Sequence, residues 1–312
     1  MRAASGLLFF LLVLLPGACS VMPGQPSDDD ADSGRRTVLT SAAGPVMLHS
    51  EEAGQGAPIV LLHGYGLSTY SWRHIRIDLA RTHHVIALDL KGFGRSQKPL
   101  DDAYGVNDQA ALIVDFLRVR KLNRVTLIGH SFGGAVAIAV ALELNRTEPK
   151  RLQRLVLLDS PAFAQKLPAA LSVLRTPYVA EAAMSAVPPE AAAAGALMLA
   201  YKDPSRIAAA DIAAYARPLY DAGTRHALIR TAERIVPDNL AELTNRYRTI
   251  RQPTLIIWCR DDRIVPLVIG FQLVASLPAA RLEVLDTCGH LPHEEAPAAT
   301  LAAIQRFLAP AR

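Results

Sequence analysis

The chain has 312 residues, of which 51% are hydrophobic and 20% charged, with a formal net charge of +4. This length suits one large domain with an insertion, or two domains, and the composition is that of a globular protein with a sizeable core. The positive charge is spread along the chain without a basic cluster, which argues against nucleic-acid binding.

The N-terminus predicts a leader. The apolar run Leu7–Leu15 follows a positively charged start and is shorter than the roughly 20 residues that span a bilayer. With small residues after it, it is typical of a secretory signal, and an ordinary apolar helix is the alternative. Pro16–Ser20 resembles the cleavage box of bacterial lipoproteins, although its proline departs from that pattern. We expect a signal peptide over residues 1–19, and an exported protein that is periplasmic, secreted, or membrane-anchored by a lipid on Cys19.

Residues 20–36 are rich in Pro, Gly, Ser and Asp, and cannot bury enough apolar surface to become ordered. We expect a flexible tether there. Beyond it, strand-like and helix-like segments alternate, which indicates a mostly parallel sheet covered on both faces. Strands are expected at 38–40, 46–49, 58–62, 85–88, 124–128, 155–158, 254–258 and 282–285, and helices at 71–80, 106–120, 134–140 and 298–308.

The alternation of strands and helices stops between residues 162 and 251. This stretch is rich in alanine, helical in pattern and interrupted by prolines. We interpret it as a helical insertion lying over the sheet, not as a separate domain.

The most informative motif is Gly129-His130-Ser131-Phe132-Gly133, between an apolar strand and an apolar helix. A serine on a sharp strand-to-helix turn projects its hydroxyl, and the flanking glycines let strand and helix pass closely. The N–H of Phe132 begins the helix and has no partner within it, so it can bind an oxyanion. The motif predicts a nucleophilic serine.

A serine nucleophile needs a base and an orienting carboxylate. In a parallel sheet these groups belong on loops after the strands. The loop after Trp258 carries Asp261 and Asp262, and the loop after Leu285 carries His290. Asp159 ends an earlier strand, so the residues alone leave three candidates for the acid.

Four blocks resemble the α/β-hydrolase superfamily from about residue 37 to the end. They are His63–Gly66, Asp89–Ser96, Gly129–Gly134, and Asp262 with Gly289-His290. The resemblance implies an α/β-hydrolase fold, with a mostly parallel doubly wound sheet from residues 37–161 and 252–312 and a helical cap from residues 162–251. It also implies these roles: Ser131 as nucleophile, His290 as base, Asp262 rather than Asp261 or Asp159 as acid, and the backbone N–H groups of Tyr65 and Phe132 as oxyanion hole.

A serine at this position argues against the haloalkane dehalogenases and epoxide hydrolases of the superfamily, which use aspartate. We predict a carboxylesterase-like enzyme that cleaves an ester, or a related acyl bond, of a small to medium apolar molecule. One alternative is hydrolysis of a carbon–carbon bond in ring-cleavage products, although Gly64–Leu67, His130–Phe132 and Leu291 depart from that branch. A haloperoxidase-like perhydrolase and a non-enzymatic anchored binding protein are further alternatives.

No cofactor-binding pattern is present, and His290 and His293 lack further residues at metal-ligand spacing, so we expect neither cofactor nor metal. Cys259 and Cys288 precede the predicted acid and base. Because disulfide geometry is strict, we favour two buried free thiols, with a bond between the two loops as the alternative. Large side chains of the insertion could line the pocket or simply pack: Tyr178, Met184, Leu197, Met198, Tyr201, Tyr215 and Tyr220.

Overall fold

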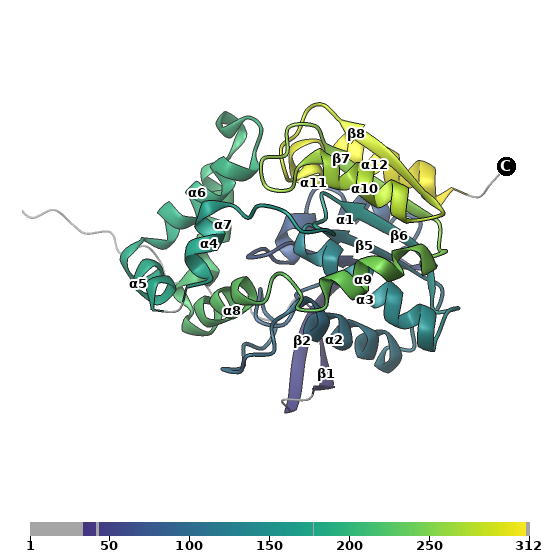
Figure 1. Ribbon diagram of the computed structural model, residues 1–312, viewed down its shortest axis with the longest axis horizontal. Helices are drawn as coiled ribbons and strands as arrows, with labels where there is room; N and C mark the ends of the chain where they lie inside the picture. The colour runs from purple at the N-terminus through teal and green to yellow at the C-terminus, as the bar shows by residue number, and fades with distance from the viewer. Residues whose placement is uncertain (1–33, 42–43, 177, 310–312) are drawn as a thin grey trace, which may run out of the picture. The chain divides into compact units, whose positions relative to one another are not determined.

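The computed structural model describes residues 34–41, 44–176 and 178–309 (Figure 1). The predicted signal peptide, the lipidation site Cys19 and most of the tether lie outside these residues. The first strand begins at Arg35, so the last two residues assigned to the tether belong to the sheet.

One eight-stranded sheet has the order β1-β2-β4-β3-β5-β6-β7-β8. β1 pairs with β2, and β2 with β4, in antiparallel fashion, whereas every later pairing is parallel. This is the mostly parallel sheet that the sequence predicts. The strands are β1 Arg35–Ser41, β2 Gly44–Ala53, β3 Pro58–Leu62, β4 His84–Leu88, β5 Val125–His130, β6 Leu152–Leu158, β7 Thr254–Cys259 and β8 Ala280–Leu285.

Successive strand residues supply two separate cores because their side chains alternate between the faces of the sheet. Leu155 and Leu157 of β6 pack in the cluster that contains α2 (Val106–Val119), α3 (Phe132–Thr147) and α10 (Leu267–Ser276). Val156 and Leu158 pack on the opposite side. There they meet α1 (Arg76–Leu79) and α12 (Pro297–Leu308). Continuous apolar strands are therefore what a sheet covered on both faces requires.

The segment between β6 and β7, which we call the helical insertion, contains no strand in its described residues. Its helices α4 to α8 gather on one side of the sheet, whereas α9 packs on α3 (Figure 1). They are α4 Ala169–Leu174, α5 Val179–Ala186, α6 Pro189–Ala200, α7 Ala209–Ala216, α8 Ala222–Glu233 and α9 Leu240–Arg246, with the 3-10 turns η3 Pro204–Arg206, η4 Arg217–Tyr220 and η5 Tyr247–Thr249.

The helix predicted over residues 71–80 is wrong. The structure has a 3-10 turn, η2 (Thr69–Trp72), and the short α1 in its place. Between them the guanidinium of Arg73 turns away to carboxylates of other elements, while Trp72 and Ile75 are both fully buried. Tertiary contacts thus override the local helical spacing.

No single helix within the described ranges is long and apolar enough to cross a membrane. The helices α5 and α6 reach that length and hydropathy only as a pair, bent by 106°.

Candidate active site

Ser131 occupies a strained turn between β5 and α3, with φ +49° and ψ −122°. Non-glycine residues rarely adopt positive φ, so the surrounding backbone must hold it there. A Cβ on Gly129 would lie 2.4 Å from the carbonyl oxygen of Gly133, and one on Gly133 would lie 2.4 Å from that of His63. Both glycines are required for the close crossing, as the sequence predicts.

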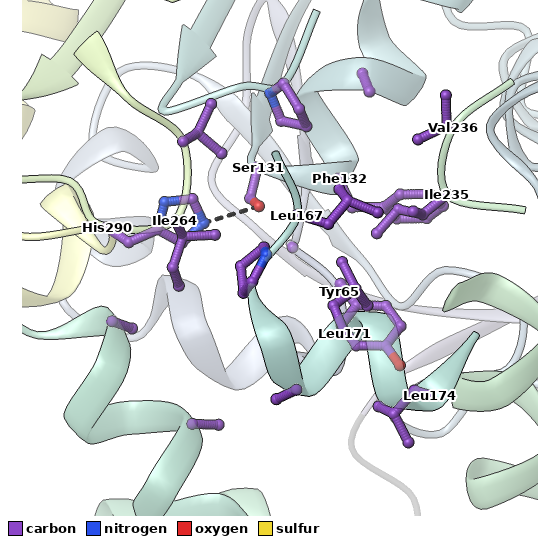
Figure 2. A pocket seen from close by; sticks show the side chains of 18 of the residues that line it. Tyr65, Ser131, Phe132, Leu167, Leu171, Leu174, Ile235, Val236, Ile264 and His290 are labelled. Carbon is purple, nitrogen blue, oxygen red and sulfur yellow. Dashed lines mark hydrogen bonds between the residues drawn. The ribbon is translucent and has the colours of Figure 1, made fainter. Parts of the chain in front are cut away.

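A hydrogen-bonded chain runs from this serine to a carboxylate, and Figure 2 shows its first bond, between Ser131 and His290. Ser131 Oγ lies 2.9 Å from His290 Nε2, and His290 Nδ1 lies 2.7 Å from Asp262 Oδ2. The other oxygen of Asp262 accepts the N–H groups of Ile264 and Val265. Asp262 is therefore held by its own loop in the position that orients His290.

The two rival carboxylates do not contact the histidine. Asp261 lies on the surface and pairs with Lys202 at 2.7 Å, and that hydrogen bond lowers the pKa of its carboxyl. Asp159 is fully buried and accepts the N–H of Cys259. The three residues that the structure brings together are those that the family resemblance selects: Ser131, His290 and Asp262.

Buried polar groups hold the loop that carries His290. Glu295 accepts the N–H groups of Gly289 and Leu291 on either side of the histidine, and that of Lys202 from the insertion. His130 Nε2 donates to the carbonyl of His290 at 2.7 Å. Burial lowers the pKa of His130 well below its usual range, so this neighbour stays neutral beside the base. Sequence reasoning missed Glu295, because it stands beside a second carboxylate, Glu294, and no local pattern distinguishes the two.

A second buried network joins the insertion to the core. Glu294 pairs with Arg73 at 2.9 Å and accepts hydrogen bonds from the hydroxyls of Tyr201 and Tyr215. Arg73 also bonds Asp211 of α7 at 2.8 Å. Nothing local in the sequence marks these residues as partners, because they come from three distant segments.

Cys259 and Cys288 form a disulfide, with their Cα atoms 5.3 Å apart. The expectation of two free thiols is therefore wrong. β7 and β8 pair in parallel with Cys259 opposite Leu285, so the chain after β8 returns Cys288 to the end of β7. The bond ties the strand before Asp262 to the loop of His290.

The N–H groups predicted for the oxyanion hole belong to Phe132, which follows the serine directly, and to Tyr65, in the loop after β3. Phe132 is the first residue of α3, so its N–H has no intrahelical acceptor, and no carbonyl among the described residues accepts from Tyr65. A Cβ on Gly64 would lie 2.8 Å from His130 Nδ1, so the loop of Tyr65 passes directly against the nucleophile turn. The arrangement could therefore hold a developing oxyanion.

The serine opens onto a cavity of about 660 Å³ between the sheet and the insertion (Figure 2). None of its described lining residues is Asp, Glu, Lys or Arg, and most are aliphatic. Such a pocket suits an apolar ligand. Side chains around it include Leu167, Leu171, Leu174, Ile235, Val236 and Ile264.

The candidate lining residues of the insertion divide into three groups. Met184 and Leu197 line the cavity. Tyr201 and Tyr215 are buried against Glu294 instead. The remaining three are exposed at the surface: Tyr178, Met198 and Tyr220. In the part of the chain that the structure describes, no group of three His, Cys, Asp or Glu could hold a metal ion.

Known proteins share this architecture. A relative from Pseudomonas putida, 2-hydroxy-6-oxo-2,4-heptadienoate hydrolase, is 30% identical over 290 residues, covering 90% of this chain and 98% of the relative. A thermophilic esterase from Thermogutta terrifontis superposes with a TM-score of 0.72 at 26% identity, over 88% of this chain and 98% of that chain.

A meta-cleavage product hydrolase from Pseudomonas fluorescens also superposes with a TM-score of 0.72, at 22% identity, over 87% of this chain and 96% of that chain, which shows the fold alone. The profile of the alpha/beta hydrolase fold matches residues 57–297. From this match, the sheet and the P. putida relative, the chain belongs to the α/β-hydrolase family.

Proposed function

We propose that this protein is a serine hydrolase that cleaves esters with an apolar acyl group through an acyl-serine intermediate. The observation that carries the proposal is the hydrogen-bonded chain Ser131–His290–Asp262, whose serine faces an apolar cavity. The general class, a hydrolase of this fold, follows from the family, and the Thermogutta esterase supports the ester bond.

The chemistry follows from these positions. Ser131 Oγ attacks the ester carbonyl carbon while His290 Nε2 takes the hydroxyl proton, and Asp262 stabilises the imidazolium. The N–H groups of Tyr65 and Phe132 hold the oxyanion. The intermediate collapses as His290 gives its proton to the departing alcohol. Water, deprotonated by His290, then cleaves the acyl-serine and releases the acid.

Hydrolysis of a carbon–carbon bond is the second candidate, and the named relatives support it better than they support ester cleavage. The substrate in the name of the P. putida enzyme is a dienoate, which carries a carboxylate. Binding a carboxylate in an apolar pocket without a cation is costly. Because no lining residue among those described is Lys or Arg, the pocket favours a neutral apolar acyl group.

The deciding experiment compares p-nitrophenyl esters of increasing acyl length with 2-hydroxy-6-oxo-2,4-heptadienoate, after fluorophosphonate labelling and mass mapping. We expect an adduct on Ser131 and a kcat/KM for esters that rises with chain length. A higher kcat/KM for the dienoate than for every ester would establish the second candidate. Absence of any adduct and of turnover would contradict both.

Export and N-terminal anchoring remain our proposal for the leader. The Cys259–Cys288 bond supports export, because disulfides persist mainly in oxidising compartments. Mass analysis of the mature N-terminus in a bacterial host would test it, with a lipidated Cys19 as one outcome and simple cleavage as the other.

A further inference from the structure

Asp159 is a buried carboxyl that the proposed reaction does not use. It follows β6 directly, has no exposed surface and adopts φ +43°. Its Oδ1 accepts the N–H of Cys259 at 2.9 Å. Its Oδ2 is buried and receives no donor from the described residues. A buried acceptor without a donor is costly, so this oxygen requires an explanation.

The neighbour of Asp159 is the acid of the proposed triad. Cys259 links the two residues, because its N–H donates to Asp159 and its carbonyl accepts the N–H of Asp262. The Asp262 side chain is close enough to act on Asp159 both through its charge and through a hydrogen bond, and both raise the pKa of Asp159. Two carboxyls form such a bond only when one of them carries a proton, because an ionised carboxylate can only accept.

The proton belongs on Asp159. Asp262 already accepts three donors, from Ile264 N, Val265 N and His290 Nδ1, which favour its ionised form. Asp159 accepts one, from Cys259. Burial, followed by the charge of Asp262, raises the pKa of Asp159 well above its usual range, and Glu295 acts in the same direction. The unpartnered Oδ2 is then a donor.

We propose that Asp159 is a positioning residue whose protonated carboxyl donates a hydrogen bond to Asp262 and so orients the carboxylate that holds His290. This inference rests on the proposed function. The bond also withdraws negative charge from Asp262, and so limits how strongly the carboxylate stabilises the imidazolium.

Infrared spectroscopy tests the protonation itself. At neutral pH the wild-type protein should show the carbonyl stretch of a protonated carboxylic acid that is missing from Asp159→Asn. The difference spectrum removes contributions from other buried acids, such as Glu294. No difference in that region would mean that Asp159 is ionised, and would overturn the proposal.

The titration of His290, followed by NMR, tests the positioning. The amide of Asp159→Asn can still donate to Asp262 and accept from Cys259, so the pKa of His290 should stay unchanged. Asp159→Ala removes the donor, and the pKa should rise by about one unit. An unmoved titration in the alanine variant would refute the role. Ser160→Ala, a buried neighbour on the same strand end, should leave the titration unmoved and controls for general disturbance.

Activity supplies the third comparison. We expect Asp159→Asn to keep kcat/KM within about threefold, and Asp159→Ala to lower it about tenfold or more with its acidic limb moved to higher pH. Loss of activity in Asp159→Asn as severe as in Asp262→Asn would instead make Asp159 an ionised partner of the triad. Failure of the proposed function would be seen separately, as the absence of a fluorophosphonate adduct on Ser131 in the wild-type protein. The infrared and NMR measurements do not require turnover, so they still test the role of Asp159 in that case.

Discussion

At the scale of single residues, the backbone fixes the conformation of Ser131, the proposed nucleophile. Ser131 keeps its positive φ because Gly129 and Gly133 let β5, β3 and α3 approach at distances that a Cβ would prevent. Its hydroxyl contributes one hydrogen bond, to His290, and none to the core. The chemistry and the stability of this turn therefore depend on different atoms.

Ser131→Ala should separate the two. Ester turnover should fall by at least about 10³-fold, because a triad lacking its nucleophile retains only binding and oxyanion stabilisation. The melting temperature should stay close to that of the wild type. Initial rates and thermal unfolding on the same preparation check both points. Substantial remaining turnover would remove Ser131 from the mechanism.

Two adjacent carboxylates provide a matched test of the acid. Asp262→Asn should reduce kcat by about 10²- to 10⁴-fold, because the amide no longer favours the required tautomer of His290. Asp261→Asn should change kcat less than about threefold, because that carboxyl is exposed and pairs only with surface cations. Equal losses in both variants would contradict the assignment of Asp262.

At the scale of elements, the sequence predicted β3, β4 and β7 well because each is a short, mostly apolar run. It predicted only the middle of β1 and β2, because polar and charged residues make up much of both strands. It placed the proposed catalytic residues after β5, β7 and β8 because parallel strands share one carboxyl edge, and Ser131, Asp262 and His290 lie there in the structure. It failed where long-range contacts decide. The predicted helix over residues 71–80 is interrupted where Arg73 pairs with carboxylates of other elements. Glu294 likewise has partners that are far from it in the sequence. The disulfide was named only as the alternative to two free thiols, because spacing alone does not fix the distance between two cysteines.

The bond between Cys259 and Cys288 should stabilise both the fold and the triad. Replacing both cysteines by serine releases a loop of 29 residues and should lower the free energy of unfolding by about 3–4 kcal/mol. Activity should fall as well, because the loops of Asp262 and His290 lose their common tie. Denaturant titration of the double variant, with reduced wild type as control, measures the change. Unchanged stability and activity would show that the bond holds neither loop.

The helix α4 should set the acyl length that the enzyme accepts. Leu171 of this helix lines the cavity, so Leu171→Trp should fill part of it. We expect kcat/KM for long-chain esters to fall by about tenfold, with little change for acetate, since lost pocket volume penalises only groups that reach it. Val179→Trp, at an exposed position of the neighbouring helix α5, is the control. Parallel losses on all esters would place the acyl group elsewhere.

At the scale of the whole molecule, a buried polar network around Glu294 links the insertion to the core. Burial raises the pKa of Glu294 above its ordinary value of 4.5, although Arg73 and two tyrosine hydroxyls act to lower it. Desolvation of this carboxylate therefore raises its pKa more than Arg73 and the tyrosine hydroxyls lower it.

This raised pKa gives stability a pH dependence of defined sign. Between pH 4.5 and the raised value the folded state holds a proton that the unfolded state releases, so stability is fully present below pH 4.5 and falls as pH rises. Because Glu294→Gln cannot ionise, its melting temperature should fall less with rising pH than that of the wild type. Thermal unfolding from about pH 4 to 8 measures the difference. The exposed Glu190→Gln should keep the decline, and a wild-type-like slope in Glu294→Gln would contradict the prediction.

The disulfide also changes what a break in the polypeptide would mean. Between Cys259 and Cys288 the chain forms a closed ring that contains Asp262, α10 and β8, and His290 follows two residues after it. A protease that cuts once within this ring cannot separate the two products, because the sulfur bridge still joins them. All three groups of the proposed catalytic chain would therefore stay in one covalent molecule after such a cut.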